Sequence, residues 1–167
     1  MNTAAVLADA FGRIQEVVTS IPRGLTPEQL AMKPYADGNT IAWLLWHLTR
    51  IQDDHLAGAS GIEQRWTAEG WFERFALPFS VAATGYGHGP DDVAAVRVDA
   101  ELLVGYHASV SDHTITWVEQ LSDADLDRIV DESWDPPVSL GVRLVSVISD
   151  DLQHAGQAAY LRGMLLA

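Results

Sequence analysis

The chain has 167 residues, a length typical of one domain, and it contains no cysteine. Disulfides, zinc–thiolate sites and a protein thiol nucleophile are therefore excluded, so any thiol chemistry needs a thiol supplied by a ligand. The formal net charge of −13 argues against nucleic acid and anionic lipid as partners, because both bind surfaces rich in lysine and arginine.

The chain also lacks the sequence features of a targeted or membrane-spanning protein. Its N-terminal residues carry no basic cluster of the kind that opens a signal peptide, and no stretch of about 18 apolar residues occurs. We therefore expect a cytoplasmic protein with a single domain over residues 1–167 and a small molecule as its ligand.

The first predicted element is a helix over residues 3–20. Pro22 and Gly24 end it, and Thr26 can then cap a short helical turn that begins at Pro27. The prediction depends on apolar residues that recur at spacings of three and four: Leu7, Phe11, Ile14, Val18 and Ile21.

A second helix is predicted from Ile41 to about Ala57. Asn39 or Thr40 is its expected N-cap, and Gly58 is expected to stop it. Its first two turns are apolar on nearly all sides, which indicates that this end is buried.

The rest of the chain predicts two more helices joined by long connections. Residues 59–89 form a connection that is long enough to cross the molecule, so the second and third helices need not be antiparallel neighbours. The third helix is predicted over residues 90–121 and the fourth over residues 140–166. We see no convincing β-pattern, so the expected fold class is all-α: a four-helix bundle with a long crossover loop between helices two and three.

The fourth predicted helix carries an unusual polar pair, Asp150 and His154. At this spacing two side chains lie about 40° apart around the helix and about 6 Å apart along it, so they can meet one ion. They share a stripe with Val147 and Leu161, which predicts that they point inward. A histidine and a carboxylate four residues apart recur as metal ligands in bundle cores.

A third ligand must come from another helix, and His47 is the best candidate. It lies between Trp46 and Leu48, where an unpaired imidazole would be costly. His55 and Asp54 lie about 12 and about 10 Å further along the helix, so neither can share an ion with His47.

The remaining histidines have weaker expected roles. His107 lies on the predicted inner stripe of helix three and can be a further ligand, a partner of a ligand or a base, whereas His88 and His113 are expected in a loop or at the surface. A purely structural role for these residues stays open as an alternative. A buried histidine is often a hydrogen-bonded core residue, and an Asp-x-x-x-His pair can be a solvated contact.

Two segments resemble signatures of the DinB-like (YfiT-like) superfamily of metal-binding helical bundles. Residues 41–55, IAWLLWHLTRIQDDH, resemble its helix-two signature, and residues 150–157, DDLQHAGQ, resemble its helix-four signature, in which two metal-binding residues four apart precede Gly-Gln. Residues 84–92, TGYGHGPDD, are similar to the branch with mycothiol-dependent transferases and the maleylpyruvate isomerase N-terminal domain.

The resemblance covers essentially the whole chain and implies that His47 and His154 bind the metal. Asp150 stands where most members have histidine and where the mycothiol branch has glutamate. Aspartate is one methylene shorter than glutamate, so this departure bears on metal affinity rather than on fold.

A three-ligand site with open positions predicts a catalytic metal, with Zn²⁺ favoured and Ni²⁺ or Fe²⁺ also suited to two imidazoles and a carboxylate. The resemblance implies a low-molecular-weight thiol as co-substrate, whose thiolate attacks an electrophilic small molecule in an S-transferase or isomerase reaction. The expected aromatic rim of the pocket consists of Trp43, Trp46, Trp71 and Tyr86.

The 59–89 connection is expected to border this pocket, with Trp71, Phe75 and Tyr86 facing it; the alternative is an aromatic plug for one end of the core. We also expect a homodimer formed through helix faces. Three other functions stay open: a metal- or ligand-binding bundle without turnover, a metal-free interaction or dimerisation protein, and a non-haem iron oxygenase.

Overall fold

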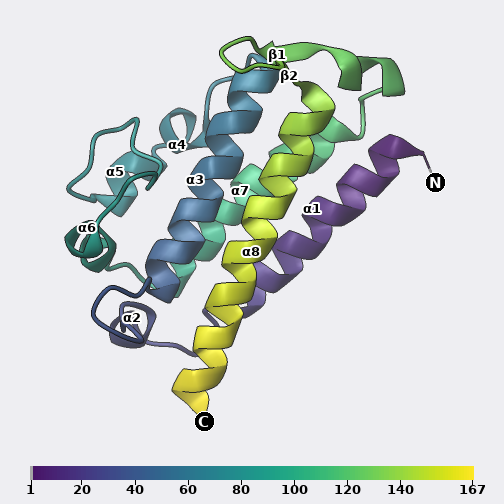
Figure 1. The fold of residues 1–167 in the computed structure, drawn as a ribbon. Coiled ribbons are helices and arrows are strands. Elements are labelled where there is room, and N and C mark those ends of the chain that lie inside the picture. The colour runs from purple at the N-terminus through teal and green to yellow at the C-terminus, as the bar shows by residue number, and fades with distance from the viewer. Residues whose placement is uncertain (1) are drawn as a thin grey trace.

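The structure is a computed structural model that describes residues 2–167. Its four long helices are α1 (Thr3–Ser20), α3 (Ile41–Ser60), α7 (Ala100–Val118) and α8 (Leu140–Leu166). Helix α3 packs on α7 and α8, and α1 packs on the same two helices from the other side, which closes a bundle (Figure 1). The predicted all-α four-helix bundle is confirmed. No helix among the described residues has both the length and the hydropathy to cross a membrane.

The second and third long helices run in the same direction. Thr49 of α3 contacts His107 of α7, and Gln52 contacts Thr114, so positions advance together along the two helices. Helices α1 and α8 run the opposite way (Figure 1). A parallel pair needs a connection that returns along the bundle, which explains the length of the segment between them.

Side-chain caps fix where the helices begin. Thr26 forms a capping box with Gln29, and Pro27 follows it, as the sequence predicts. Each such cap contributes about 1 kcal/mol to helix stability. Helix α3 ends at Gly61 rather than at Gly58, because Gly61 adopts a left-handed φ of 74° and a glycine inside a helix costs only about 1 kcal/mol. Further side-chain caps are Asn2, Thr40, Asp99 and Ser139.

The prediction of a single third helix over residues 90–121 is wrong, because the helical conformation is interrupted between α6 (Pro90–Ala95) and α7. Val96 and Val98 are both buried while Arg97 between them is exposed, which is the alternation of an extended strand rather than of a helix. Asp99 then caps the start of α7 through its side chain.

The crossover contains two short helices, α4 (Arg65–Ala68) and α5 (Trp71–Phe75), and a short α2 (Pro27–Leu30) precedes α3. Trp66 of α4 packs on Tyr106 of α7 with ring centroids 5.1 Å apart. The crossover is therefore anchored on the bundle by aromatic side chains rather than free of it.

The connection before α8 holds a small element that the sequence analysis did not predict. After the 3₁₀ helix η1 (Asp123–Asp127), strands β1 (Ile129–Asp131) and β2 (Val138–Ser139) pair antiparallel. Their hairpin lies over the end of the bundle where α3 finishes and α8 starts (Figure 1).

Candidate metal centre

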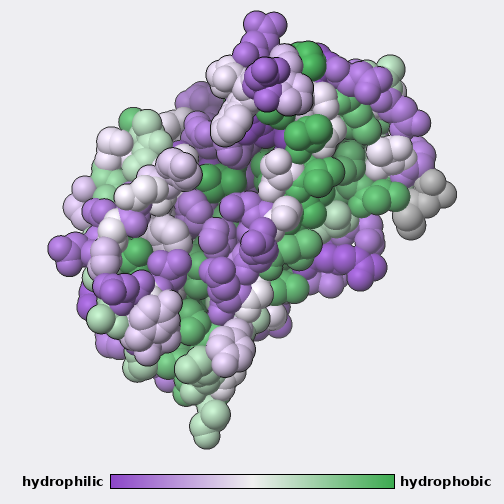
Figure 2. Space-filling model, in the orientation of Figure 1, coloured by the Kyte–Doolittle hydropathy of each residue, from purple (hydrophilic) through white to green (hydrophobic). Residues whose placement is uncertain are grey.

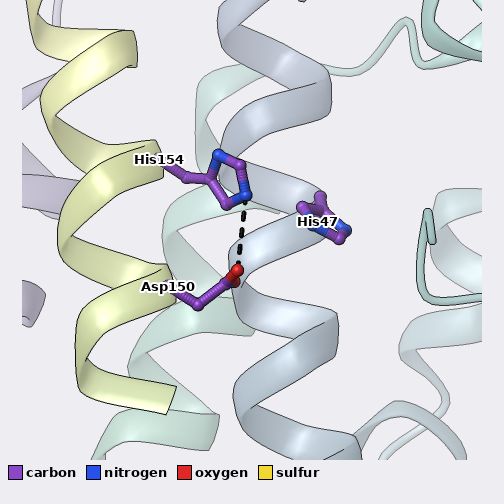
Figure 3. Close-up of side chains that lie close together, drawn as sticks. All are labelled: His47, Asp150 and His154. Carbon is purple, nitrogen blue, oxygen red and sulfur yellow. Dashed lines mark ion pairs between the residues drawn. The ribbon is translucent and has the colours of Figure 1, made fainter. Parts of the chain in front are cut away.

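Three side chains from two antiparallel helices converge between α3 and α8. His47 comes from α3, and Asp150 and His154 come from α8; one ligating atom of each lies within 4.8 Å of the others (Figure 3). His154 Nε2 lies 3.5 Å from Asp150 Oδ1. Since metal–ligand bonds of about 2.1 Å put two tetrahedral ligands about 3.5 Å apart, a small side-chain adjustment closes this set around an ion. The predicted convergence is confirmed.

Hydrogen bonds orient both imidazoles toward the shared point. His47 Nδ1 lies 2.6 Å from the Thr84 carbonyl oxygen, and His154 Nδ1 lies 3.1 Å from the Gln157 side-chain oxygen. Because both oxygens only accept, each Nδ1 donates its proton, and each Nε2 is the atom that faces the shared point. The hydrogen bond with Asp150 raises the pKa of His154, so a metal would displace a proton from its Nε2. Histidine ligands of metals characteristically donate their other N–H to a carbonyl or carboxylate in this way.

The charges at the site also suit a cation. Burial lowers the pKa of His47, which favours the neutral imidazole that a metal needs. Burial would raise the pKa of Asp150, but the interaction with His154 outweighs it and the pKa falls, so the carboxylate is ionised. Asp150 Oδ2 is buried without a hydrogen-bond partner among residues 2–167, and a bound cation would supply that partner.

Comparison with known proteins agrees with this geometry. A family model described as the DinB superfamily matches residues 10–158. The chain belongs to the DinB superfamily. The crystal structure of a conserved protein from Enterococcus faecalis is similar to this DinB-superfamily chain, with a TM-score of 0.91 and 28% identity over 99% of this chain and 98% of that one. A comparison with curated proteins found no match. Family and geometry together indicate a divalent-metal site.

Trp43 forms one wall of the site in this DinB-superfamily protein. Its ring stacks on His47 with centroids 4.6 Å apart and planes 14° from parallel, and it meets His154 edge-on at 6.3 Å. Trp43 Nε1 donates to His88 Nδ1 at 3.2 Å. The loop residue His88 is therefore half-buried next to the site, and it also stacks on Trp46.

The crossover reaches the metal centre through its backbone. A Cβ atom added at Gly85 would lie 2.6 Å from His47 Nδ1 and 3.1 Å from the Trp46 ring, so only glycine fits there. Gly85 also has φ of 94°, which other residues rarely adopt. The absence of a side chain at Gly85 is what lets the neighbouring Thr84 carbonyl bind His47.

We expect Gly85→Ala to weaken metal binding by about 10- to 100-fold, the usual effect of disturbing the hydrogen-bonding partner of a metal ligand. The added methyl group collides with His47, and the positive φ costs about 1–3 kcal/mol of stability. Zinc titration calorimetry together with thermal unfolding measures both effects. Gly87→Ala is the matched control: it has φ of 78° and open space around it, so it shares the strain without the collision. Equal losses of affinity in the two variants would contradict this reading.

A buried arginine holds the crossover in place. Arg50 is fully buried on α3, and its guanidinium donates to the Ala83 carbonyl at 3.1 Å, to Gln64 at 2.8 Å and to the Tyr106 hydroxyl at 3.2 Å. Ala83 directly precedes Thr84, so Arg50 positions the carbonyl that binds His47. The sequence analysis missed this residue; the available signal was a charged side chain one turn after His47 in an otherwise buried helix.

Asp53 completes this network one turn further along α3. Its carboxylate accepts from the backbone N–H groups of Arg65 at 2.9 Å and Trp66 at 2.8 Å, and from the Tyr106 hydroxyl at 2.7 Å. It lies 3.7 Å from Arg50. Three hydrogen bonds and one ion pair offset the cost of burying this charge and pin the start of α4 to the bundle.

Two residues expected at the pocket rim lie elsewhere. Trp71 packs on Tyr106 and under the Arg74 guanidinium, and Tyr86 is 91% exposed. Phe75, also expected to face the site, packs in the same cluster as Trp71, against Tyr106. Gly85 and Gly87 both have positive φ, and the turn that they form directs Tyr86 into solvent.

Tyr86→Ala is accordingly expected to change neither stability nor metal affinity. An exposed side chain without packing partners contributes within about 0.5 kcal/mol of zero. Thermal unfolding and zinc titration of this variant check the prediction. A large fall in melting temperature would instead support the alternative that Tyr86 is part of an aromatic plug for one end of the core.

The other polar core residues lie behind the metal centre rather than in it. His107 donates from Nδ1 to the Thr49 hydroxyl at 3.1 Å, because that hydroxyl already donates to the Leu45 carbonyl. Burial lowers the pKa of His107 to about 4. Of the three roles considered for His107, neither a further ligand nor a hydrogen-bonding partner of a ligand is seen, since His107 is absent from the converging group and its hydrogen bond goes to Thr49. Asp151, which the sequence analysis overlooked, is fully buried, and its pKa is raised by burial and by Asp150.

Two clefts lie along α3 and α8 beyond the metal centre, one in each direction, and none of the three candidate ligands lines either of them. An apolar cleft of about 450 Å³ is lined by Leu44 and Gln157, one helical turn from His47 and His154 respectively. A larger cleft of about 700 Å³ lies in the other direction, toward the C-terminal end of α3, and its lining mixes apolar residues with charged ones such as Asp54 and Arg143. Figure 2 shows the surface hollowed at this end of the bundle, beneath the hairpin, with hydrophilic groups around it. Both clefts have the size of a small-molecule site.

Proposed function

We propose that this protein is a metal-dependent enzyme that uses a low-molecular-weight thiol to attack an electrophilic small molecule, in an S-transferase or isomerase reaction. The observation that carries the proposal is the group of two imidazole nitrogens and one carboxylate that meet between α3 and α8, with a cleft further along these helices in each direction. Three protein ligands with free positions are typical of a catalytic metal rather than of a structural one. Zn²⁺ suits the donor set best, and Ni²⁺ or Fe²⁺ also fit it.

The residues around the site have distinct roles in this reaction. A bound divalent ion supplies the charge that lowers the pKa of a coordinated thiol. Thr84 and Gln157 hold the two imidazoles in the orientation that binds it, and Trp43 covers one side. The side chain of Asp150 is 36% exposed, so the thiol and its partner reach the site from the α8 side.

Two observations support a thiol that comes from outside the protein. The chain has no cysteine, so its own side chains cannot supply a thiolate. Residues 84–92, which include the Thr84 and Gly85 contacts to His47, are the segment that resembles the mycothiol-dependent branch. The proposal of an external thiol therefore rests on the segment of the crossover that contacts the candidate metal ligand His47.

The test is turnover of an electrophile, such as a chlorinated nitroaromatic, by zinc-loaded protein with and without a series of small thiols. We expect a rate that saturates with thiol and disappears in His154→Ala. A second readout is the cobalt-loaded protein, where thiol binding should give a thiolate–metal absorption band. Turnover that needs no thiol, or no band with any thiol, would reject the proposal.

We also propose that two copies of the chain associate through the outer face of α8. This face exposes Val142, Val145 and Leu152, which are 55%, 64% and 48% exposed. Figure 2 shows hydrophobic surface in a band along α8 and α1. Continuous apolar surface of this kind marks interaction sites.

Light scattering at micromolar concentration is expected to give twice the chain mass of 18.2 kDa. Val145→Glu should return the mass to that of the monomer without loss of helicity, because it places a charge in the contact. A wild-type mass near 18.2 kDa would reject the dimer.

A further inference from the structure

The glycine-rich turn of the crossover holds a histidine against the wall of the metal centre. The backbone N–H of His88 donates to the Gly85 carbonyl at 3.1 Å, which closes a four-residue turn whose first residue lies against His47. The His88 ring packs on Phe79, with centroids 4.5 Å apart, and stacks on Trp46 at 5.7 Å with planes 16° from parallel. Backbone and aromatic contacts together therefore fix the place of this ring.

The fixed ring presents a hydrogen-bond acceptor to Trp43. Trp43 Nε1 donates to His88 Nδ1 at 3.2 Å. Because an indole N–H only donates, His88 Nδ1 accepts, and the neutral ring carries its proton on Nε2. Trp43 is only 6% exposed, so a partner inside the protein satisfies its N–H. In contrast, Trp46 Nε1 on the next turn of α3 is buried without a partner among residues 2–167. Of these two indoles, Trp43 is the one whose orientation a hydrogen bond sets.

Trp43 in turn contacts both imidazoles of the metal centre. Its ring lies parallel to His47 at 4.6 Å and meets His154 edge-on at 6.3 Å, and the two imidazoles are 4.9 Å apart. A rotated indole would no longer hold the plane of His47 or the edge of His154. Metal affinity depends on how firmly the surroundings of a histidine ligand fix its ring. The orientation of Trp43 therefore bears on both histidine ligands at once.

We propose that His88 is a positioning residue of the metal centre, which acts on His47 and His154 through the hydrogen bond from Trp43. The inference rests on the candidate metal centre and not on thiol chemistry, so it applies to a metal-binding protein as well as to an enzyme. The alternative is that the His88 ring only fills space beside Trp46. In that case its replacement changes stability and leaves metal coordination as it was.

Two substitutions separate the hydrogen bond from the packing. His88→Phe keeps a ring beside Trp46 but has no acceptor for Trp43, whereas His88→Asn has no ring but keeps an acceptor, its Oδ1, at about the position of Nδ1. Titration of metal-free protein with Co²⁺, followed by visible absorption, measures affinity and coordination geometry together. We expect His88→Phe to weaken binding about fivefold, the factor that corresponds to one neutral hydrogen bond, and to change the spectrum at saturation. His88→Asn should keep the wild-type spectrum and bind within about twofold of the wild type.

Trp43→Phe tests the same hydrogen bond from its other end. It keeps a ring that can stack on His47 and removes the donor. Its affinity loss should match that of His88→Phe, and the double variant should lose no more than either single variant, because both remove one shared contact. The His47 ring protons give a readout without metal. An aromatic ring stacked at 4.6 Å shields them, so their NMR signals should move in His88→Phe and stay in place in His88→Asn.

His113→Phe is the matched control, because His113 is also half-buried and accepts from one side chain, that of Arg65, at 3.2 Å. Its Co²⁺ affinity and spectrum should equal those of the wild type. Wild-type behaviour of His88→Phe, equal losses in His88→Phe and His88→Asn, or additive losses in the double variant would each overturn the positioning role. A wild-type protein that binds no Co²⁺ would overturn it together with the metal centre. A protein that binds Co²⁺ in the expected pattern but uses no thiol would overturn the proposed function alone.

Discussion

His47→Ala is expected to abolish stoichiometric binding of a divalent metal. The substitution leaves Asp150 and His154 as the only members of the converging group, and both come from one helix. Loss of a ligand should cost more than the about 100-fold that loss of a ligand's hydrogen-bonding partner costs. Elemental analysis after purification without chelators, followed by zinc titration, measures the effect.

His55→Ala is the matched control, because it removes an imidazole from the same helix two turns away. It should retain one metal per chain, since His55 pairs with Arg143 rather than with the converging group. Full metal content in His47→Ala would show that the metal binds elsewhere in the molecule. Loss of metal in His55→Ala would instead place the ion in the larger cleft, which His55 lines.

Helical geometry explains why the centre of this site was predictable. The spacing of Asp150 and His154 fixes their relative positions once α8 is a helix, and His47 lies in the most buried part of α3. The inward stripe was assigned with a small error. The core face of α8 passes through Val147 and Asp151, whereas Asp150 and His154 lie at its edge, facing α3.

The parts of the site that the sequence did not predict depend on contacts between distant segments. The Thr84 carbonyl reaches His47 only because the crossover follows one path over the bundle, and spacing along the chain contains no information on that path. Aromatic residues misled the prediction, since Trp71 and Phe75 pack against α7 and Tyr86 points outward. In this loop the backbone, rather than the large side chains, contacts the site.

The helix boundaries show the same limit. Periodicity predicted α1 and α8 with their observed ends, because their caps are local. The break before α7 was missed, since the Val-Arg-Val segment at residues 96–98 is compatible with a helix and contains no glycine or proline. Burial of both valines against the core decides the extended conformation, and that burial is a tertiary effect.

The second large effect is expected from Arg50→Met, which should lower the free energy of unfolding by about 3–5 kcal/mol. Methionine fills similar space but leaves the Asp53 carboxylate buried without its cation, and that uncompensated charge is the cost. For a chain of this size the melting temperature should fall by roughly 6–20 °C. Arg13→Met, which removes an exposed ion pair with Asp9, should leave the melting temperature unchanged.

The double variant Arg50→Met with Asp53→Asn separates stability from function. Asparagine removes the uncompensated charge and keeps a side-chain oxygen that accepts from the buried donors around position 53, so part of the lost stability should return. Zinc affinity should stay low, because the hydrogen bond from Arg50 to the Ala83 carbonyl is still missing and Thr84 is no longer held against His47. Calorimetric unfolding and zinc titration of the two single variants and the double variant give the comparison. Recovery of zinc affinity together with stability would show that Arg50 only balances the Asp53 charge and does not position the crossover for the metal centre.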